Sequence, residues 1–192
     1  MSFKKIASFS IALISIGVVS LALINPQNFS KIGDIGDIFK EELPTNCLSG
    51  RVGSDGPILV VKIDDTRAAH PQIGLEDADL VYIEQVEAGL TRLAAVFSSK
   101  IPSIIGPVRS ARISDLEILE QFGRVAFAYS GAQKKLLPVI AEANVENLGA
   151  QRQSSEIYAN DPLRNPPTAM ILQAQTLTQK VEEQKLPVAV SK

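Results

Sequence analysis

Two arginines, Arg109 and Arg112, stand three residues apart in the stretch Gly106-Pro-Val-Arg-Ser-Ala-Arg112, directly before a sequence that predicts a helix start. Guanidinium groups donate hydrogen bonds in a planar geometry that suits carboxylate and phosphate oxygens. A helix start adds free backbone N–H groups, which favour a negative charge. The stretch therefore predicts a site for an anionic group. Asp115, in the first turn of the predicted helix, partly opposes that field.

Three carboxylates and a third arginine precede this stretch. Asp64 and Glu84 each end an apolar run of strand length, and Glu87 and Arg92 lie shortly after the second run. Strand-end carboxylates can bind Mg²⁺ or Ca²⁺ or act as general acids and bases, and they can equally neutralise arginines in a structural network. No catalytic or metal-binding residue is assigned, and no cofactor is expected. The candidate binding residues are Asp64, Glu84, Glu87, Arg92, Arg109 and Arg112.

Signals for other chemistry are weak. Tyr129-Ser-Gly131 lacks the first glycine of a nucleophile elbow, because Ala128 stands in its place. The only histidine, His70, precedes a proline, which favours an extended loop over a metal site. The sequence contains no phosphate loop or dinucleotide fingerprint. A binding protein is therefore favoured over an enzyme.

The elements that position the candidate residues follow from hydrophobic periodicity. Strands are expected at 58–64, 79–84, 90–98 and 124–129. Alternation sends Leu80, Tyr82 and Glu84 to one face of the second strand. The short link to the third strand predicts an antiparallel pair, which brings Arg92 close to Glu84 or Glu87.

Helices are expected between and after these strands. Ser114 is the predicted N-cap of the first, with Glu117 three residues on, and Gly123 is its predicted left-handed end. A second is expected near 133–143, where Pro138 fits only in the first turn or at a kink. A third is expected over 166–185, and the last residues, 186–192, are compatible with a further strand. The expected fold class is α/β, with a mixed sheet of about four strands and helices packed on it.

The N-terminus predicts a membrane helix before this domain. Residues 1–5 are basic, and residues 6–24 form an uncharged run of 19 residues. A membrane span needs about 20 residues and a secretory signal about 7–15, so a signal anchor and a cleaved signal peptide both stay open. The positive-inside rule predicts a single-pass protein of the cell membrane with its C-terminal domain outside the cytoplasm, or a secreted protein after cleavage.

Composition separates a linker from one folded domain. Residues 25–57 are rich in Pro, Gly, Asn, Ser and Asp and predict a linker, and residues 58–192 predict an α/β domain. Subtracting the two leader lysines from 19 basic residues leaves 17 against 21 acidic ones, so no nucleic-acid partner is expected. Cys47 has no second cysteine to pair with, and it lacks the small preceding residue typical of lipid attachment.

Several motifs, in fixed order over about residues 47–176, resemble a known family. They are Val61-Lys-Ile-Asp64, His70-Pro-Gln-Ile-Gly-Leu75, Ala78-Asp-Leu-Val-Tyr-Ile-Glu84, Val86-Glu-Ala-Gly-Leu-Thr-Arg92, Ala95-Val-Phe97, Gly106-Pro-Val-Arg-Ser-Ala-Arg112 and Tyr129-Ser-Gly131. The order resembles DUF3048, the YerB-like lipoproteins of bacteria. The resemblance implies an extracytoplasmic, membrane-attached protein and implies no established reaction.

Two departures from that family are expected to matter. Family members continue into a further C-terminal domain, and this sequence ends at Lys192, so it is expected to lack that domain. Asn165-Pro-Pro-Thr-Ala-Met170 replaces an Ala-Pro-His-Asn-like segment, and the missing histidine argues against acid–base or metal chemistry there.

The combined prediction is a membrane-anchored binding or interaction protein of the bacterial cell envelope. Its arginine and glutamate residues are expected to hold an anionic or polyhydroxylated ligand or a partner protein. The expected partners are the membrane, through the N-terminal helix, and an envelope polymer or envelope protein. The alternative is a cell-envelope hydrolase or transferase that uses the strand-end carboxylates.

Overall fold

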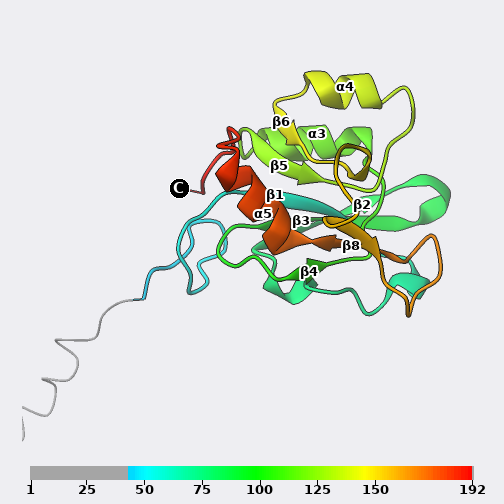
Figure 1. Ribbon diagram of the computed structural model, residues 1–192, viewed down its shortest axis with the longest axis horizontal. Helices are drawn as coiled ribbons and strands as arrows, with labels where there is room; N and C mark the ends of the chain where they lie inside the picture. Colours follow the sequence, from blue (N-terminus) through cyan, green and yellow to red (C-terminus); the bar gives the residue numbers. More distant parts are fainter. Residues whose placement is uncertain (1–42, 192) are drawn as a thin grey trace, which may run out of the picture. The chain divides into compact units, whose positions relative to one another are not determined.

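The computed structural model describes residues 43–191, in which a five-stranded sheet carries most of the core (Figure 1). Its strand order is β2-β3-β1-β5-β6. The β1–β3 and β2–β3 pairs are antiparallel, and the β1–β5 and β5–β6 pairs are parallel. The predicted mixed sheet is confirmed, with β6 as a strand that was not expected. The strands are β1 (Leu59–Asp64), β2 (Leu80–Gln85), β3 (Thr91–Phe97), β5 (Val125–Ala128) and β6 (Val145–Asn147).

The predicted N-terminal membrane helix lies outside the described residues. Among residues 43–191, every helix is too short or too polar to cross a bilayer.

A second, antiparallel sheet of three strands has the order β4-β8-β7. It contains β4 (Ile104–Ile105), β7 (Tyr158–Asn160) and β8 (Met170–Gln173). The prediction of one helix over 166–185 is wrong at β8, and α5 (Ala174–Glu183) begins only after it. The reason is tertiary: β8 is the central strand, so its backbone is paired on both sides while Ile171 and Leu172 are buried.

Two helices cover one face of the larger sheet, and α5 and the second sheet cover the opposite face (Figure 1). Alternate strand residues such as Val60 and Val96 pack with α3 (Ile113–Glu120) and α4 (Leu137–Glu142). The intervening residues, including Val61 and Leu93, pack with α5 and β8. Four short 3-10 turns complete the described chain, at Arg67–Ala69, Leu75–Asp77, Glu87–Gly89 and Ala150–Arg152.

α3 begins two residues earlier than a Ser114 N-cap would place it. Arg112 is the N-cap, and its backbone N–H donates to Asp115 Oδ2 at 2.6 Å. The Ser114 hydroxyl is instead committed to Glu84. Gly123 has the expected left-handed conformation, with φ of 75°. α4 is shorter than the helix predicted near 133–143, and Pro138 lies in its first turn as expected.

Residues 43–57, the last part of the predicted linker, pack on the folded body. Asn46 is buried, and its side-chain amide donates to Asp55, Ser98 and Ser191. Contacts to residues so distant in sequence make this segment part of the domain.

The stretch from Gly106 to Arg112 lies between the C-terminal ends of β1 and β5. These strands pair directly over Leu59–Val61, and beyond that point the stretch takes the place of the direct pairing. On the β1 side, Arg109 N donates to Lys62 O at 2.8 Å, and on the β5 side Ser130 N donates to Arg109 O at 2.9 Å. Ligands of α/β sheets bind beyond such strand ends, so the arginines occupy the expected edge.

The loop at Ile73 and Gly74 supports this stretch, because Ile73 and Gly106 exchange both backbone hydrogen bonds. Gly74 has φ of +74°, and a Cβ there would lie 2.5 Å from Ile104 O. Gly74→Ala should therefore lose more stability in urea unfolding than Gly50→Ala, where φ is +66° and a Cβ meets nothing within 4 Å. Both variants carry a left-handed penalty of about 1–2 kcal/mol. Equal losses in the free energy of unfolding would show that the close approach to Ile104 O adds nothing to the left-handed penalty.

Candidate functional site

One face of the larger sheet carries a row of charged side chains. The register places Asp64, Arg92 and Glu84 next to one another across β1, β3 and β2. Lys62 lies two residues before Asp64 on the same face, opposite the small side chain of Ala94. This face is the one covered by α3, so the row meets the start of that helix.

The inner part of the site is a buried triad of Lys62, Glu84 and Asp115. Lys62 is 0% exposed; its ammonium pairs with the Glu84 carboxylate and lies 2.7 Å from Asp115 Oδ1. Ser114 Oγ donates to the second Glu84 oxygen at 2.6 Å. Buried charges persist only when they are paired and hydrogen-bonded, and these contacts meet that need.

The two carboxyls of the triad differ in proton affinity. Burial raises the pKa of Asp115 to about 7, although the Lys62 ammonium opposes the shift. Burial also acts to raise the pKa of Glu84, but hydrogen bonds from Asp115, Lys62 and Ser114 lower it below its ordinary value. The proton that the pair retains near neutral pH therefore resides on Asp115. Because the triad is closed from solvent, it links β1 and β2 to α3 rather than offering groups to a ligand.

The outer part of the site is an arginine cluster formed by Arg92, Arg109 and Arg112. Arg92 Nη1 donates to the backbone oxygen of Ser110 at 3.0 Å. Arg112 donates from Nε and Nη2 to a single Glu87 oxygen at 3.0 and 2.8 Å. Arg112 Nη1 also donates to the backbone oxygen of Ala111 at 3.0 Å, and each of the three guanidinium groups still has N–H groups without a partner among the described residues.

Arg109 forms an ion pair with Asp64 that is not aligned as a hydrogen bond. Arg109 Nε lies 2.9 Å from Asp64 Oδ2, yet neither atom has a hydrogen-bond partner among the described residues. Asp64 is fully buried, and its Oδ1 accepts the backbone N–H of Thr66 at 2.9 Å. Asp64 is therefore a fixed counter-charge at the base of the cluster.

The cluster carries an excess of positive charge at a partly exposed surface. Burial lowers the pKa of Arg92, and the Arg112 and Arg109 cations lower it further, against the opposing effect of Asp64 and Glu87. Three guanidinium groups thus face two carboxylates. The side chains of Arg109 and Arg112 are 24% and 18% exposed, so an anionic group in solution can reach them.

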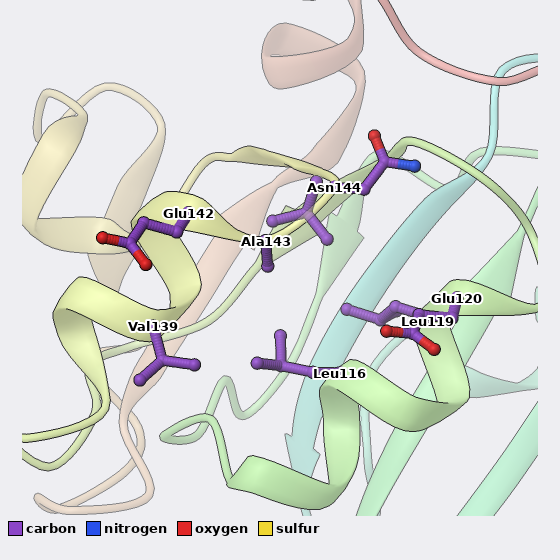
Figure 2. Close-up of a pocket in the computed structure, with 8 residues that line it drawn as sticks. Leu116, Leu119, Glu120, Val139, Glu142, Ala143 and Asn144 are labelled. Carbon is purple, nitrogen blue, oxygen red and sulfur yellow. The ribbon is translucent and has the colours of Figure 1, made fainter.

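Beside the cluster, two cavities lie along the helices. The first, of 360 Å³, is lined by Glu87, Arg112, Ile113, Gln133, Lys135, Leu136 and Val139. The second, of 270 Å³, lies between α3 and α4 and shares Val139 with the first. Figure 2 shows Leu116 and Val139 projecting into the space between the two helices. Of the predicted site residues, Glu87 and Arg112 line the first cavity.

The other predicted residues divide between the two parts of the site. Asp64, Arg92 and Arg109 belong with Arg112 at the carboxyl edge of the sheet, and Glu84 belongs to the buried triad. Lys62 was missed as a member, and its signal was a lysine inside an otherwise apolar run, two residues before Asp64. Ser114 was predicted only as a helix N-cap, and its hydrogen bond to Glu84 was not expected.

Neither His70 nor a cluster of potential metal ligands forms a further site among the described residues. His70 Nε2 lies 3.2 Å from Asp65 Oδ1 at the surface. In the part of the chain that the structure describes, no three His, Cys, Asp or Glu side chains converge to hold a metal ion.

The fold and sequence match known proteins over most of the described domain. Residues 46–187 match the family described as "Protein of unknown function (DUF3048) N-terminal domain". The chain is 31% identical over 121 residues to "Putative lipoprotein YerB" of Bacillus subtilis (strain 168), covering 62% of this chain and 36% of that protein. The chain thus spans about a third of that relative's length. The crystal structure of YerB from Bacillus subtilis is similar in fold, with a TM-score of 0.66 at 22% identity, over 76% of this chain and 51% of that chain. The predicted resemblance is confirmed, and this chain belongs to the DUF3048 family.

Proposed function

We propose that this chain is an envelope-associated binding protein that holds an anionic group at the arginine cluster. The observation that carries the proposal is the concentration of Arg92, Arg109 and Arg112 around only two carboxylates; burial lowers the pKa of Arg92, and repulsion from the other two guanidinium groups lowers it further. A bound anion relieves this repulsion and accepts hydrogen bonds from the open guanidinium N–H groups. The ligand is a phosphate- or carboxylate-bearing envelope polymer or an acidic segment of a partner protein.

Two further observations support an extracytoplasmic location. The uncharged run 6–24 follows two lysines, which is typical of a signal anchor or signal peptide. The relative from Bacillus subtilis carries the name of a lipoprotein. We propose that the domain works outside the cytoplasm, attached to the membrane or released after cleavage.

The geometry favours binding over the alternative of a hydrolase or transferase. Glu84 is enclosed by Lys62, Ser114 and Asp115, and Asp64 is fully buried beside Arg109. A general acid or base must lie within hydrogen-bond reach of the substrate, and these two carboxylates are held away from solvent.

Sulfate and pyrophosphate, compared with chloride at equal ionic strength, test the proposal by thermal unfolding of the full chain. Both anions should raise the Tm of the wild type, because binding to the native state stabilises it. A triple variant, Asp64→Asn with Arg109→Gln and Arg112→Ala, should lose this response. Asp64→Asn is included because Arg109→Gln alone would leave the Asp64 carboxylate buried without its paired cation.

Arg124→Ala is the matched control for this experiment. Arg124 precedes β5, at the edge opposite the cluster, and pairs with Glu146 at 3.1 Å. Its variant should respond to sulfate like the wild type. An undiminished response in the cluster variant would overturn the proposal, and a large loss of Tm in chloride would assign the arginines to folding.

A further inference from the structure

The two cavities beside α3 and α4 adjoin at Val139, which lines both, and we call them together the interhelix groove. The first cavity joins the residues that begin both helices, Arg112 and Ile113 with Leu136. The second joins the residues that end both helices, Glu120 with Glu142 and Ala143. The helices therefore run in the same direction on either side of one groove, with Val139 at the junction.

The middle of the groove is apolar and open to solvent. Val139, at the junction, is 43% exposed, and Ile113, at the first end, is 62% exposed, which is high for large apolar side chains on neighbouring elements. Leu116 and Val139 project into the space between the helices (Figure 2), and Leu119 and Val145 lie buried beneath it. This surface offers apolar contact to a side chain that enters from solvent.

The two ends of the groove carry opposite charges. Arg112 and Lys135 line the first end, where Glu87 already accepts from Arg112, and Glu120 and Glu142 line the second. Figure 2 places the two terminal glutamates on opposite sides of the space. Lys135, Glu120 and Glu142 form no ion pair with another residue in the range 43–191. These charges are therefore available to a partner.

We propose that the interhelix groove binds a peptide segment of a partner protein, with apolar side chains between an acidic and a basic residue. The acidic residue lies at Arg112 and Lys135, and the basic residue lies at Glu120 and Glu142. The eight residues of α3 span about 12 Å, which an extended peptide covers with about four residues. The inference deepens the proposed function, on which it rests at Arg112, by naming the partner class and its charge order.

Three fluorescein-labelled peptides of equal length test the charge order by anisotropy with the full chain. They are Asp-Leu-Val-Leu-Lys, Asp-Leu-Val-Leu-Asp and Lys-Leu-Val-Leu-Lys, with blocked ends. The mixed-charge peptide should bind about tenfold more tightly than either uniform peptide, because one misplaced charge turns an attraction into a repulsion. In Glu120→Lys/Glu142→Lys, the preference should move to the peptide with two aspartates.

Val139→Ser tests the apolar middle, and Leu163→Ser is its control, since Leu163 is an exposed apolar residue outside the groove. Val139→Ser should lose peptide binding at least tenfold while keeping its thermal response to sulfate, and Leu163→Ser should change neither. Equal binding of the three peptides, or none, overturns the groove proposal, as does a preference that ignores the charge reversal. Binding of phosphatidylglycerol vesicles that needs Val139, without peptide binding, also overturns it. If sulfate does not raise the Tm of the wild type, the proposed anion site at the arginine cluster is overturned instead.

Discussion

Lys62→Met should lower the free energy of unfolding by about 3–5 kcal/mol, because it removes the only cation between two buried carboxyls. Lys62 is 0% exposed, and its ammonium contacts both Glu84 and Asp115. Methionine keeps most of the apolar stem, so the loss reports the missing charge rather than a cavity. Urea unfolding at pH 7 measures it.

Lys100→Met supplies a control for the same substitution at an exposed ion pair. Lys100 Nζ lies 2.8 Å from Asp77 Oδ1, and its side chain is mostly exposed, so its loss should stay below about 1 kcal/mol. Adding Glu84→Gln and Asp115→Asn to Lys62→Met should recover much of the stability, because no uncompensated charge then remains. A Lys62→Met variant as stable as the wild type would show that the triad is not a linked charge network.

The sequence correctly predicted features that depend on a regular hydrophobic period or on a short connection. Alternation in 79–84 placed Leu80, Tyr82 and Glu84 on one face, and the observed register confirms it. The short link to the next strand likewise predicted the antiparallel pair that aligns Glu84 with Arg92. Both inferences depend only on neighbours in sequence, which is why they hold.

Features set by distant residues were not predictable in this way. The residues of β8 were predicted to be helical, because their own sequence does not indicate that β4 and β7 pair with them on either side. Ser114 reads as an N-cap because nothing nearby reveals that Glu84, thirty residues earlier, takes its hydroxyl. Glu84 is aligned with Arg92 in the register, yet its carboxylate pairs with Lys62, which also contacts Asp115 at the start of α3. The sequence therefore indicated that the six candidate residues lie close together, but it revealed neither Lys62 and Asp115 as members of the triad nor the division into a buried triad and an open cluster.

Between about pH 4.5 and 7, the contribution of Asp115 to stability should fall as pH rises. Its pKa is about 7 in the folded chain against an ordinary 3.8, so the native state binds the proton more tightly than the unfolded state. The stabilisation is complete below pH 3.8 and is lost as pH rises through about 7, with a slope of up to about 1.4 kcal/mol per pH unit. Glu84 has the opposite sign: its lowered pKa gives stability that is lost only in more acidic solution, below about pH 4.5.

The difference between wild type and Asp115→Asn reports this contribution above about pH 4.5, because groups that do not contact Asp115 titrate alike in both proteins and the lowered pKa of Glu84 places its own titration at more acidic pH. Relative to the wild type, the variant should gain up to about 3 kcal/mol in the free energy of unfolding from pH 4.5 to 7. Asparagine remains neutral, and its side-chain oxygen can still accept the Arg112 N–H that caps α3. Parallel curves for the two proteins would place the retained proton elsewhere than on Asp115. A difference that vanishes in the Lys62→Met background would instead tie the proton's position to the ammonium that holds the two carboxyls together.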